Sequence, residues 1–188
     1  MNKYLAEFLG TYALVFAGTG AIVIDQQTGG TVTHVGIAIT FGLIVMSMIY
    51  AFGDISGAHI NPAVTIAFTL ARRFPLKRLP YYLVSQIAGA TLASITLKLL
   101  FPANQLLGAS LPAGSDAQSF ILEFLLTFFL MLVIINVSTG SKEQGLFAGI
   151  AIGAVVCLEA LFAGPASLFS MDLLNGSHYR RPHSHPRI

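Results

Sequence analysis

Long apolar runs separated by short polar segments dominate the chain. Five of these runs are about 20 residues long, which is the length that an α-helix needs to cross the hydrocarbon core of a bilayer. We place the spans at about 4–24, 34–52, 80–101, 119–137 and 145–163. The pattern predicts an all-α membrane protein.

A short polar stretch with the sequence SGAHINPAVT, residues 56–65, lies between the second and third spans. Asn61 is a favourable N-cap, and Pro62 follows at the first helical position, where its missing N–H has no cost. From there the pattern is helical for roughly 12 residues, or about half a bilayer. A helix that begins near the midplane must line a cavity, because lipid cannot satisfy its free backbone groups. We expect a re-entrant half-helix over about 62–71, preceded by an extended and buried segment over 54–60.

This stretch resembles the first signature loop of the aquaporin and glycerol-facilitator family, the major intrinsic proteins. The resemblance extends from about residue 6 to residue 165. It implies an aquaporin-like fold and a passive channel for water or small uncharged solutes such as glycerol. It also implies that four copies assemble, and that the protein is not an enzyme and needs no cofactor.

The resemblance assigns roles to individual residues of the expected pore. The Asn61 side-chain oxygen would cap the half-helix while its amide N–H groups face the permeant molecule, with Pro62 and Ala63 completing the motif. The residues before it correspond to a stretch whose backbone carbonyls line the pore; they are Gly57, Ala58, His59 and Ile60. Phe41 and Ala160 correspond to two members of the selectivity constriction. For Phe41 the alternative is ordinary packing.

An internal repeat is visible in the sequence. EFLGT at 7–11 recurs as EFLLT at 123–127, and GIAI at 36–39 recurs at 149–152. Three spans separate the copies, so the second copy is inverted in the membrane and the site is expected where the halves meet. In chain order we expect a first repeat at 1–101, an outer loop at 102–118, a partial second repeat at 119–167 and a divergent polar tail at 168–188.

The second half departs from the family pattern. Where Asn-Pro-Ala-Arg is expected, the chain has Asp172, Leu173, Leu174 and Asn175, so the arginine of the constriction is absent. The residues after Asn175 are too polar to span a bilayer. We therefore expect five spans, no sixth span and an irregular segment beyond about residue 168. One alternative function follows: a truncated family member that conducts poorly or not at all.

Three glutamates, Glu7, Glu123 and Glu159, lie inside predicted spans. Carboxylates within a membrane are expensive and mark polar networks or proton relays. Glu7 and Glu123 are equivalent in the repeat, and the resemblance implies that both support the pore loops by accepting hydrogen bonds. The second alternative function is a proton-coupled transporter that uses all three. Glu159 has no counterpart in the repeat and no assigned role.

Composition agrees with a membrane protein and limits its partners. Hydrophobic residues make up 55% of the chain, charged residues only 10%, and the mean hydropathy is +0.76. The net charge of +2 argues against nucleic acid as a partner, which leaves the lipid bilayer and the permeant solute. No second ligand accompanies His59 at metal-binding spacing. Lysines and arginines flank one side of the spans, which predicts a cytoplasmic N-terminus. We expect a multi-pass protein of the plasma (inner) membrane.

Overall fold

The computed structural model describes residues 1–109, 115–138 and 142–168, and within these ranges the chain is helical and contains no strand. In chain order the elements are α1 (Lys3–Gln27), α2 (Thr33–Ser56), α3 (Pro62–Leu70), η1 (Leu76–Arg78), α4 (Leu79–Leu100), α5 (Asp116–Ser138) and α6 (Lys142–Leu168).

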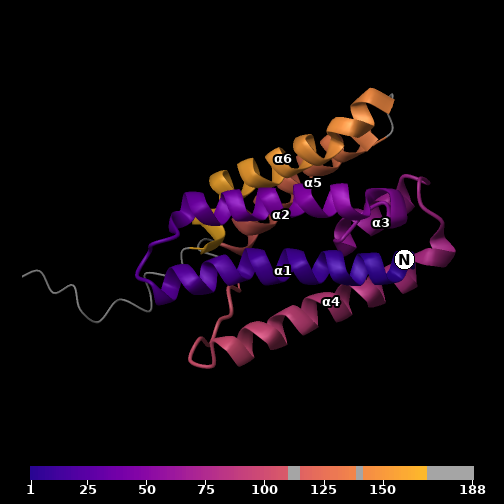
Figure 1. The fold of residues 1–188 in the computed structure, drawn as a ribbon. Helices are drawn as coiled ribbons and strands as arrows, with labels where there is room; N and C mark the ends of the chain where they lie inside the picture. The colour runs from indigo at the N-terminus through magenta and orange to yellow at the C-terminus, as the bar shows by residue number, and fades with distance from the viewer. Residues whose placement is uncertain (110–114, 139–141, 169–188) are drawn as a thin grey trace, which may run out of the picture.

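All five predicted spans are present. In the described part of the chain, five helices are long and apolar enough to cross a membrane. They are α1, α2, α4, α5 and α6, and they run roughly side by side, whereas α3 is a short helix at the end of the bundle where the N-terminus lies (Figure 1). The tail from residue 169 onward lies outside the described residues, and so do the expectations made for it.

The segment before α3 differs in part from the prediction. Residues 54–56 were expected to be extended, but α2 continues through Ser56. Gly57 ends this helix in the left-handed conformation, with φ of 89°. Glycine adopts that conformation without a Cβ clash, which makes it the usual residue for ending a helix. Gly57 to Asn61 leave the helical path, and of these Ala58 and Ile60 are buried.

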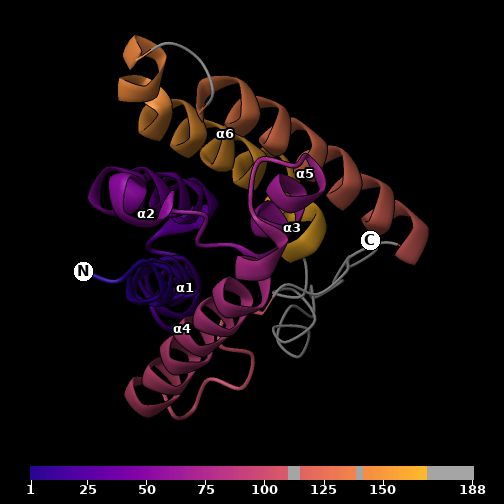
Figure 2. The same cartoon turned by 90° about the vertical axis from the view of Figure 1, so that its right-hand side faces the viewer.

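The helices form two flanks around α3 (Figure 2). One flank contains α1 packed on α4, and the other contains α5 packed on α6; α2 connects them because it packs on both α1 and α6. Glycines let α2 and α6 approach closely. A Cβ atom added to Gly42 of α2 would lie 2.6 Å from the carbonyl oxygen of Gly153 in α6. Such contacts between small residues are typical of helix pairs in membranes.

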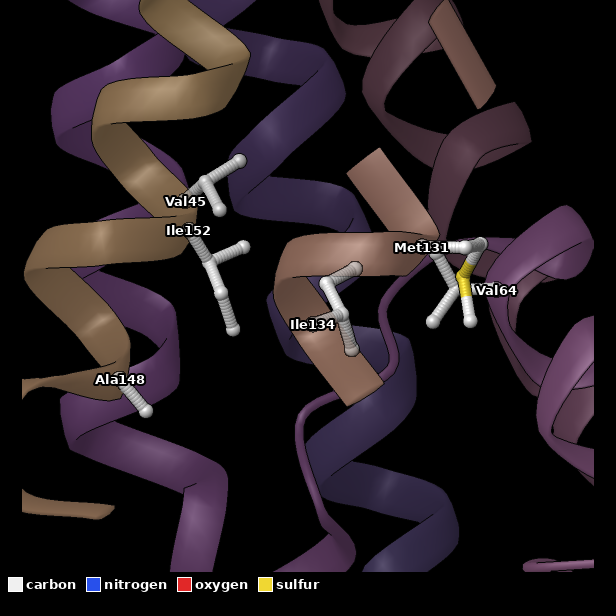
Figure 3. Packing of buried hydrophobic residues seen from close by; sticks show 6 residues of the cluster. All are labelled: Val45, Val64, Met131, Ile134, Ala148 and Ile152. Atoms are coloured by element: carbon white, nitrogen blue, oxygen red, sulfur yellow. The ribbon is translucent and has the colours of Figure 1, made fainter. Parts of the chain in front are cut away.

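An apolar cluster joins α3 to the α5–α6 flank (Figure 3). Its buried members are Val45 of α2, Val64 of α3, Met131 and Ile134 of α5, and Ala148 and Ile152 of α6. On this side, apolar packing around Val64 holds the half-helix in place.

Candidate functional site

The half-helix begins as the sequence predicts. Asn61 is the N-cap, and its side-chain Oδ1 accepts a hydrogen bond from the backbone N–H of Ala63 at 2.8 Å. Its carbonyl oxygen accepts the first helical bond, from the N–H of Thr65 at 3.1 Å. Pro62 occupies the first turn and Ala71 is the C-cap. The predicted half-helix is therefore confirmed.

The buried carboxylate of Glu7, on α1, holds the loop before α3. Its Oε1 accepts hydrogen bonds from the Ser56 hydroxyl at 2.7 Å and from the His59 backbone N–H at 2.9 Å. Its Oε2 accepts from the Ile60 N–H at 2.7 Å and from the Gln86 side chain at 2.7 Å. Both oxygens are thus fully used, and four donors from α2, the loop and α4 converge on one fully buried side chain.

Two side chains of α4 complete this network, and the sequence analysis missed both. Gln86, which is fully buried, also donates from Nε2 to the Thr65 hydroxyl at 2.9 Å. The Tyr82 hydroxyl donates to the Ser56 carbonyl at 2.7 Å. A signal was present, because a glutamine inside an apolar span needs buried polar partners.

The loop backbone between Gly57 and Asn61 is strained. Ala58 and Ile60 have positive φ values of 44° and 42°, which non-glycine residues rarely adopt. Within the described chain, no hydrogen bond reaches the carbonyl oxygens of Gly57, Ala58, His59 or Ile60. Such strain persists only where the surroundings enforce it, and here the Glu7 carboxylate does so.

The loop faces a cavity of about 600 Å³. Gly57, Ala58, His59, Ile60 and Asn61 line one wall, and the side chains of the apolar cluster line much of the other. A second cavity of about 290 Å³, toward α1 and α4, is lined by Thr11 and Gln86. Ile60 and Asn61 line both cavities, so the start of the half-helix lies between them. The site therefore offers hydrogen-bond donors at the helix end and acceptors along the loop.

His59 is packed among aromatic rings in the loop, outside the spanning helices. Its ring stacks on Phe68 with centroids 4.8 Å apart, and its Nδ1 lies 3.2 Å from the Thr65 hydroxyl. Burial lowers the pKa of the imidazole. The negative charge of Glu7 raises this pKa, but its influence is smaller than that of burial. In the described ranges no group of three potential metal ligands surrounds His59 or any other residue.

The other predicted residues are placed unequally. Phe41 lines the larger cavity and packs against Gly18 of α1. Ala160 does not line that cavity in the described chain, whereas its neighbour Glu159 does. Glu123 is exposed on α5 and accepts no hydrogen bond from any described residue, so its expected support of the loop stays a prediction. Asp172 and Asn175 lie outside the described residues.

Comparison with known proteins shows the family to which the chain belongs. The sequence model of the family described as Major intrinsic protein matches residues 1–175. The chain is 51% identical over 173 residues to Aquaporin NIP1-1 of Oryza sativa subsp. japonica, covering 92% of this chain and 61% of that protein. It is 46% identical to Nodulin-26 of Glycine max, covering 92% and 64%.

Among solved structures, the fold is similar to that of an aquaglyceroporin from Plasmodium falciparum. The TM-score is 0.74 at 28% identity, covering 93% of this chain and 82% of that one. The chain spans about three fifths of the length of the curated relatives that it matches, since it covers 61% of the first.

Proposed function

Because the chain belongs to the major intrinsic protein family, we propose that it forms a passive membrane channel for water and small uncharged solutes such as glycerol, and that it is not an enzyme. One observation carries the proposal: the capped start of the half-helix, at Asn61, lies between two cavities inside the bundle. Within a membrane, a helix end with free backbone groups is tolerated where it lines a water-filled cavity, which suits the passage of a polar molecule.

The chemistry of the loop supports passage of neutral hydrogen-bonding molecules. The half-helix N-terminus carries a partial positive charge, which disfavours cations and protons. The Asn61 side-chain N–H groups can donate to an oxygen of the permeant molecule, since the side-chain oxygen already accepts from Ala63. The carbonyls of Gly57 to Ile60, which accept no hydrogen bond from the described residues, offer acceptors for its O–H groups. A water or polyol molecule can exchange its hydrogen bonds along this path.

The proton-coupled transporter is not favoured. Glu7, the most deeply buried of its three glutamates, already accepts four hydrogen bonds, and proton uptake would break some of them. The family membership also supports a channel that needs no ion gradient.

Stopped-flow light scattering on proteoliposomes tests the proposal. Vesicles containing the protein should shrink in an osmotic gradient faster than empty vesicles and should re-swell as glycerol enters. A pH gradient should leave both rates unchanged. Rates equal to those of empty vesicles would contradict the channel, and rates that follow the pH gradient would favour the transporter.

We also propose that the protein lies in the plasma (inner) membrane with its N-terminus cytoplasmic. Arg72, Arg73, Lys77 and Arg78 lie between α3 and α4, at the end of the bundle where the N-terminus lies (Figure 1). The connections at the other end, 28–32 and 101–109, contain no lysine or arginine. Cationic loops remain on the cytoplasmic side during insertion. Labelling of single cysteines placed in these loops, from outside intact cells, would reveal the opposite orientation if it exists.

A homotetramer is the assembly that we propose, following the resemblance to the family. The α5 face bearing Phe120, Phe124 and Phe128 is highly exposed, at 72%, 62% and 53%. Lipid or a second copy of the chain can cover such a face. Chemical cross-linking in the membrane should yield species up to four chains; a monomer alone would contradict the proposal.

A further inference from the structure

Cations are concentrated in the connection between α3 and α4. Four of the ten lysines and arginines of the chain lie within residues 72–78, and all four are exposed. Asp54 is the only acidic residue between positions 26 and 115. None of the four cations forms an ion pair in the part of the chain that the structure describes. Among the described residues, nothing neutralises their charge.

Exposed leucines accompany these cations. Leu70, the last residue of α3, is 79% exposed, and Leu76, the first residue of η1, is 70% exposed. The C-terminal end of α3 favours nearby cations, but it does not explain the leucines. An apolar side chain at this exposure is stabilised where it can leave water, so the leucines mark a surface that meets hydrocarbon. Cations and leucines on one short segment are typical of a surface that lies at a membrane interface.

The position of this connection agrees with that reading. It forms the edge of the bundle beside the N-terminus (Figure 1). Two tyrosines lie next to it: Tyr81 at the start of α4 is 61% exposed, and its ring is 5.7 Å from that of Tyr4 in α1. Exposed tyrosines gather at the depth of the lipid headgroups. Residues 70–78, which we call the basic loop, therefore lie where hydrocarbon meets phosphate.

We propose that the basic loop binds anionic phospholipid. Leu70 and Leu76 contact the acyl chains, while Arg72, Arg73 and Arg78 contact the phosphate, which the planar guanidinium group can bind through two N–H donors. Charge complementarity selects an anionic headgroup over a zwitterionic one, since the loop has no carboxylate to meet a choline group. This site is independent of the channel and does not require the protein to conduct.

The test measures which lipid remains bound to the chain. The protein is reconstituted in phosphatidylcholine with a minor fraction of phosphatidylglycerol, extracted in a neutral detergent, and its retained lipids are counted by mass spectrometry. We expect phosphatidylglycerol to be enriched over its share in the membrane. Replacing the three arginines together (Arg72→Gln, Arg73→Gln and Arg78→Gln) should lower the enrichment by about fivefold or more.

A matched control removes the same charge elsewhere: Arg180→Gln, Arg181→Gln and Arg187→Gln should leave the enrichment unchanged. The triple variant Arg72→Lys, Arg73→Lys and Arg78→Lys keeps the charge and loses the paired N–H donors, so it should retain more enrichment than the glutamine variant, which separates loss of charge from misfolding. Inorganic phosphate should displace no more lipid than sodium chloride of equal ionic strength. The proposal would be overturned if both glutamine variants lost the enrichment equally, or if phosphate displaced the lipid more than sodium chloride does. It would also be overturned if no enrichment were found, and that result would point to a protein partner for this surface.

Discussion

The Glu7 carboxylate of α1 accepts a hydrogen bond from the backbone N–H of Ile60 at 2.7 Å. Ile60 directly precedes Asn61, so this bond fixes the chain immediately before the cap of the half-helix. The same carboxylate binds the Ser56 hydroxyl at the end of α2 and Gln86 on α4. One acidic side chain thus joins the helices that meet at the site.

Replacing Glu7 tests this role. Glu7→Gln turns one acceptor oxygen into a donor that faces existing donors, and at least one buried N–H or hydroxyl loses its partner. We expect the free energy of unfolding to fall by about 1–3 kcal/mol, the cost of an unsatisfied buried polar group. Denaturation in detergent, followed by circular dichroism, measures the change.

Glu123→Gln is the comparison, because Glu123 is the repeat equivalent of Glu7 but is exposed and accepts no hydrogen bond within the described chain. Its substitution should change the free energy of unfolding by less than about 0.5 kcal/mol. A loss as large as that of Glu7→Gln would restore the role that the repeat assigns to Glu123.

Two substitutions at Asn61 separate capping from permeation. Aspartate and serine are as good as asparagine at the N-cap, so stability should stay within about 0.5 kcal/mol in both variants. Asn61→Asp places a negative charge beside the cavities, whereas Asn61→Ser replaces the two amide N–H donors with the single O–H donor of a shorter, neutral side chain. We expect glycerol flux in proteoliposomes to decrease in both, and cation leakage to increase only in Asn61→Asp. Unchanged flux in both variants would remove Asn61 from the permeation path.

The contact between α2 and α6 depends on Gly42. A Cβ at this position would lie 2.6 Å from both the Gly153 carbonyl oxygen and the Cys157 Cβ, so the helices would have to separate. We expect Gly42→Ala to destabilise the protein by about 1–3 kcal/mol. Gly53 of the same helix has no atom within 4 Å of its added Cβ. Gly53→Ala should therefore be neutral or stabilising by up to about 1 kcal/mol; equal losses in both would contradict the close-contact explanation.

Stability should depend on pH through His59. Burial lowers the pKa of its imidazole in the folded protein, whereas in the unfolded chain the imidazole takes up a proton at about pH 6.5. Below that pH the unfolded state binds more protons than the folded state. The free energy of unfolding therefore falls as the pH drops from about 6.5 toward the lower pKa of the folded state. Above about pH 6.5 the contribution of His59 to stability is fully present. His59→Gln should reduce this slope in denaturation experiments. An unchanged slope would show that other groups cause it.

The fold could be predicted where local chemistry decides the structure. Apolar run lengths located the five spanning helices, and the Asn61–Pro62 pair located the start of α3. The end of α2 was misplaced because the segment before the half-helix was expected to be extended from residue 54, whereas Gly57 supplies the conformation that actually ends the helix. A glycine with φ of 89° is recognised only once the path of the chain is known.

The site was only partly predictable, because its polar contacts join residues far apart in the sequence. Glu7 was identified as a buried acceptor, but nothing in the sequence shows that Gln86, seventy-nine positions away, is its partner. The register between α1 and α4 decides that contact. Glu159 and Ala160 illustrate the same limit, since neighbouring residues on a helix face different directions and a one-residue difference decides which one lines the cavity.

The two walls of the larger cavity are held by different forces, and this affects how freely each can vary. The loop wall depends on directional hydrogen bonds from backbone N–H groups to the Glu7 carboxylate, so its shape depends on that one acceptor, and loss of the acceptor would leave several buried donors without a partner. The opposite wall, formed by residues such as Ile134 and Ile152, is hydrocarbon, and a cluster of this kind tolerates exchanges that conserve volume. The bore can therefore be widened or narrowed during evolution from one side while the loop keeps its shape.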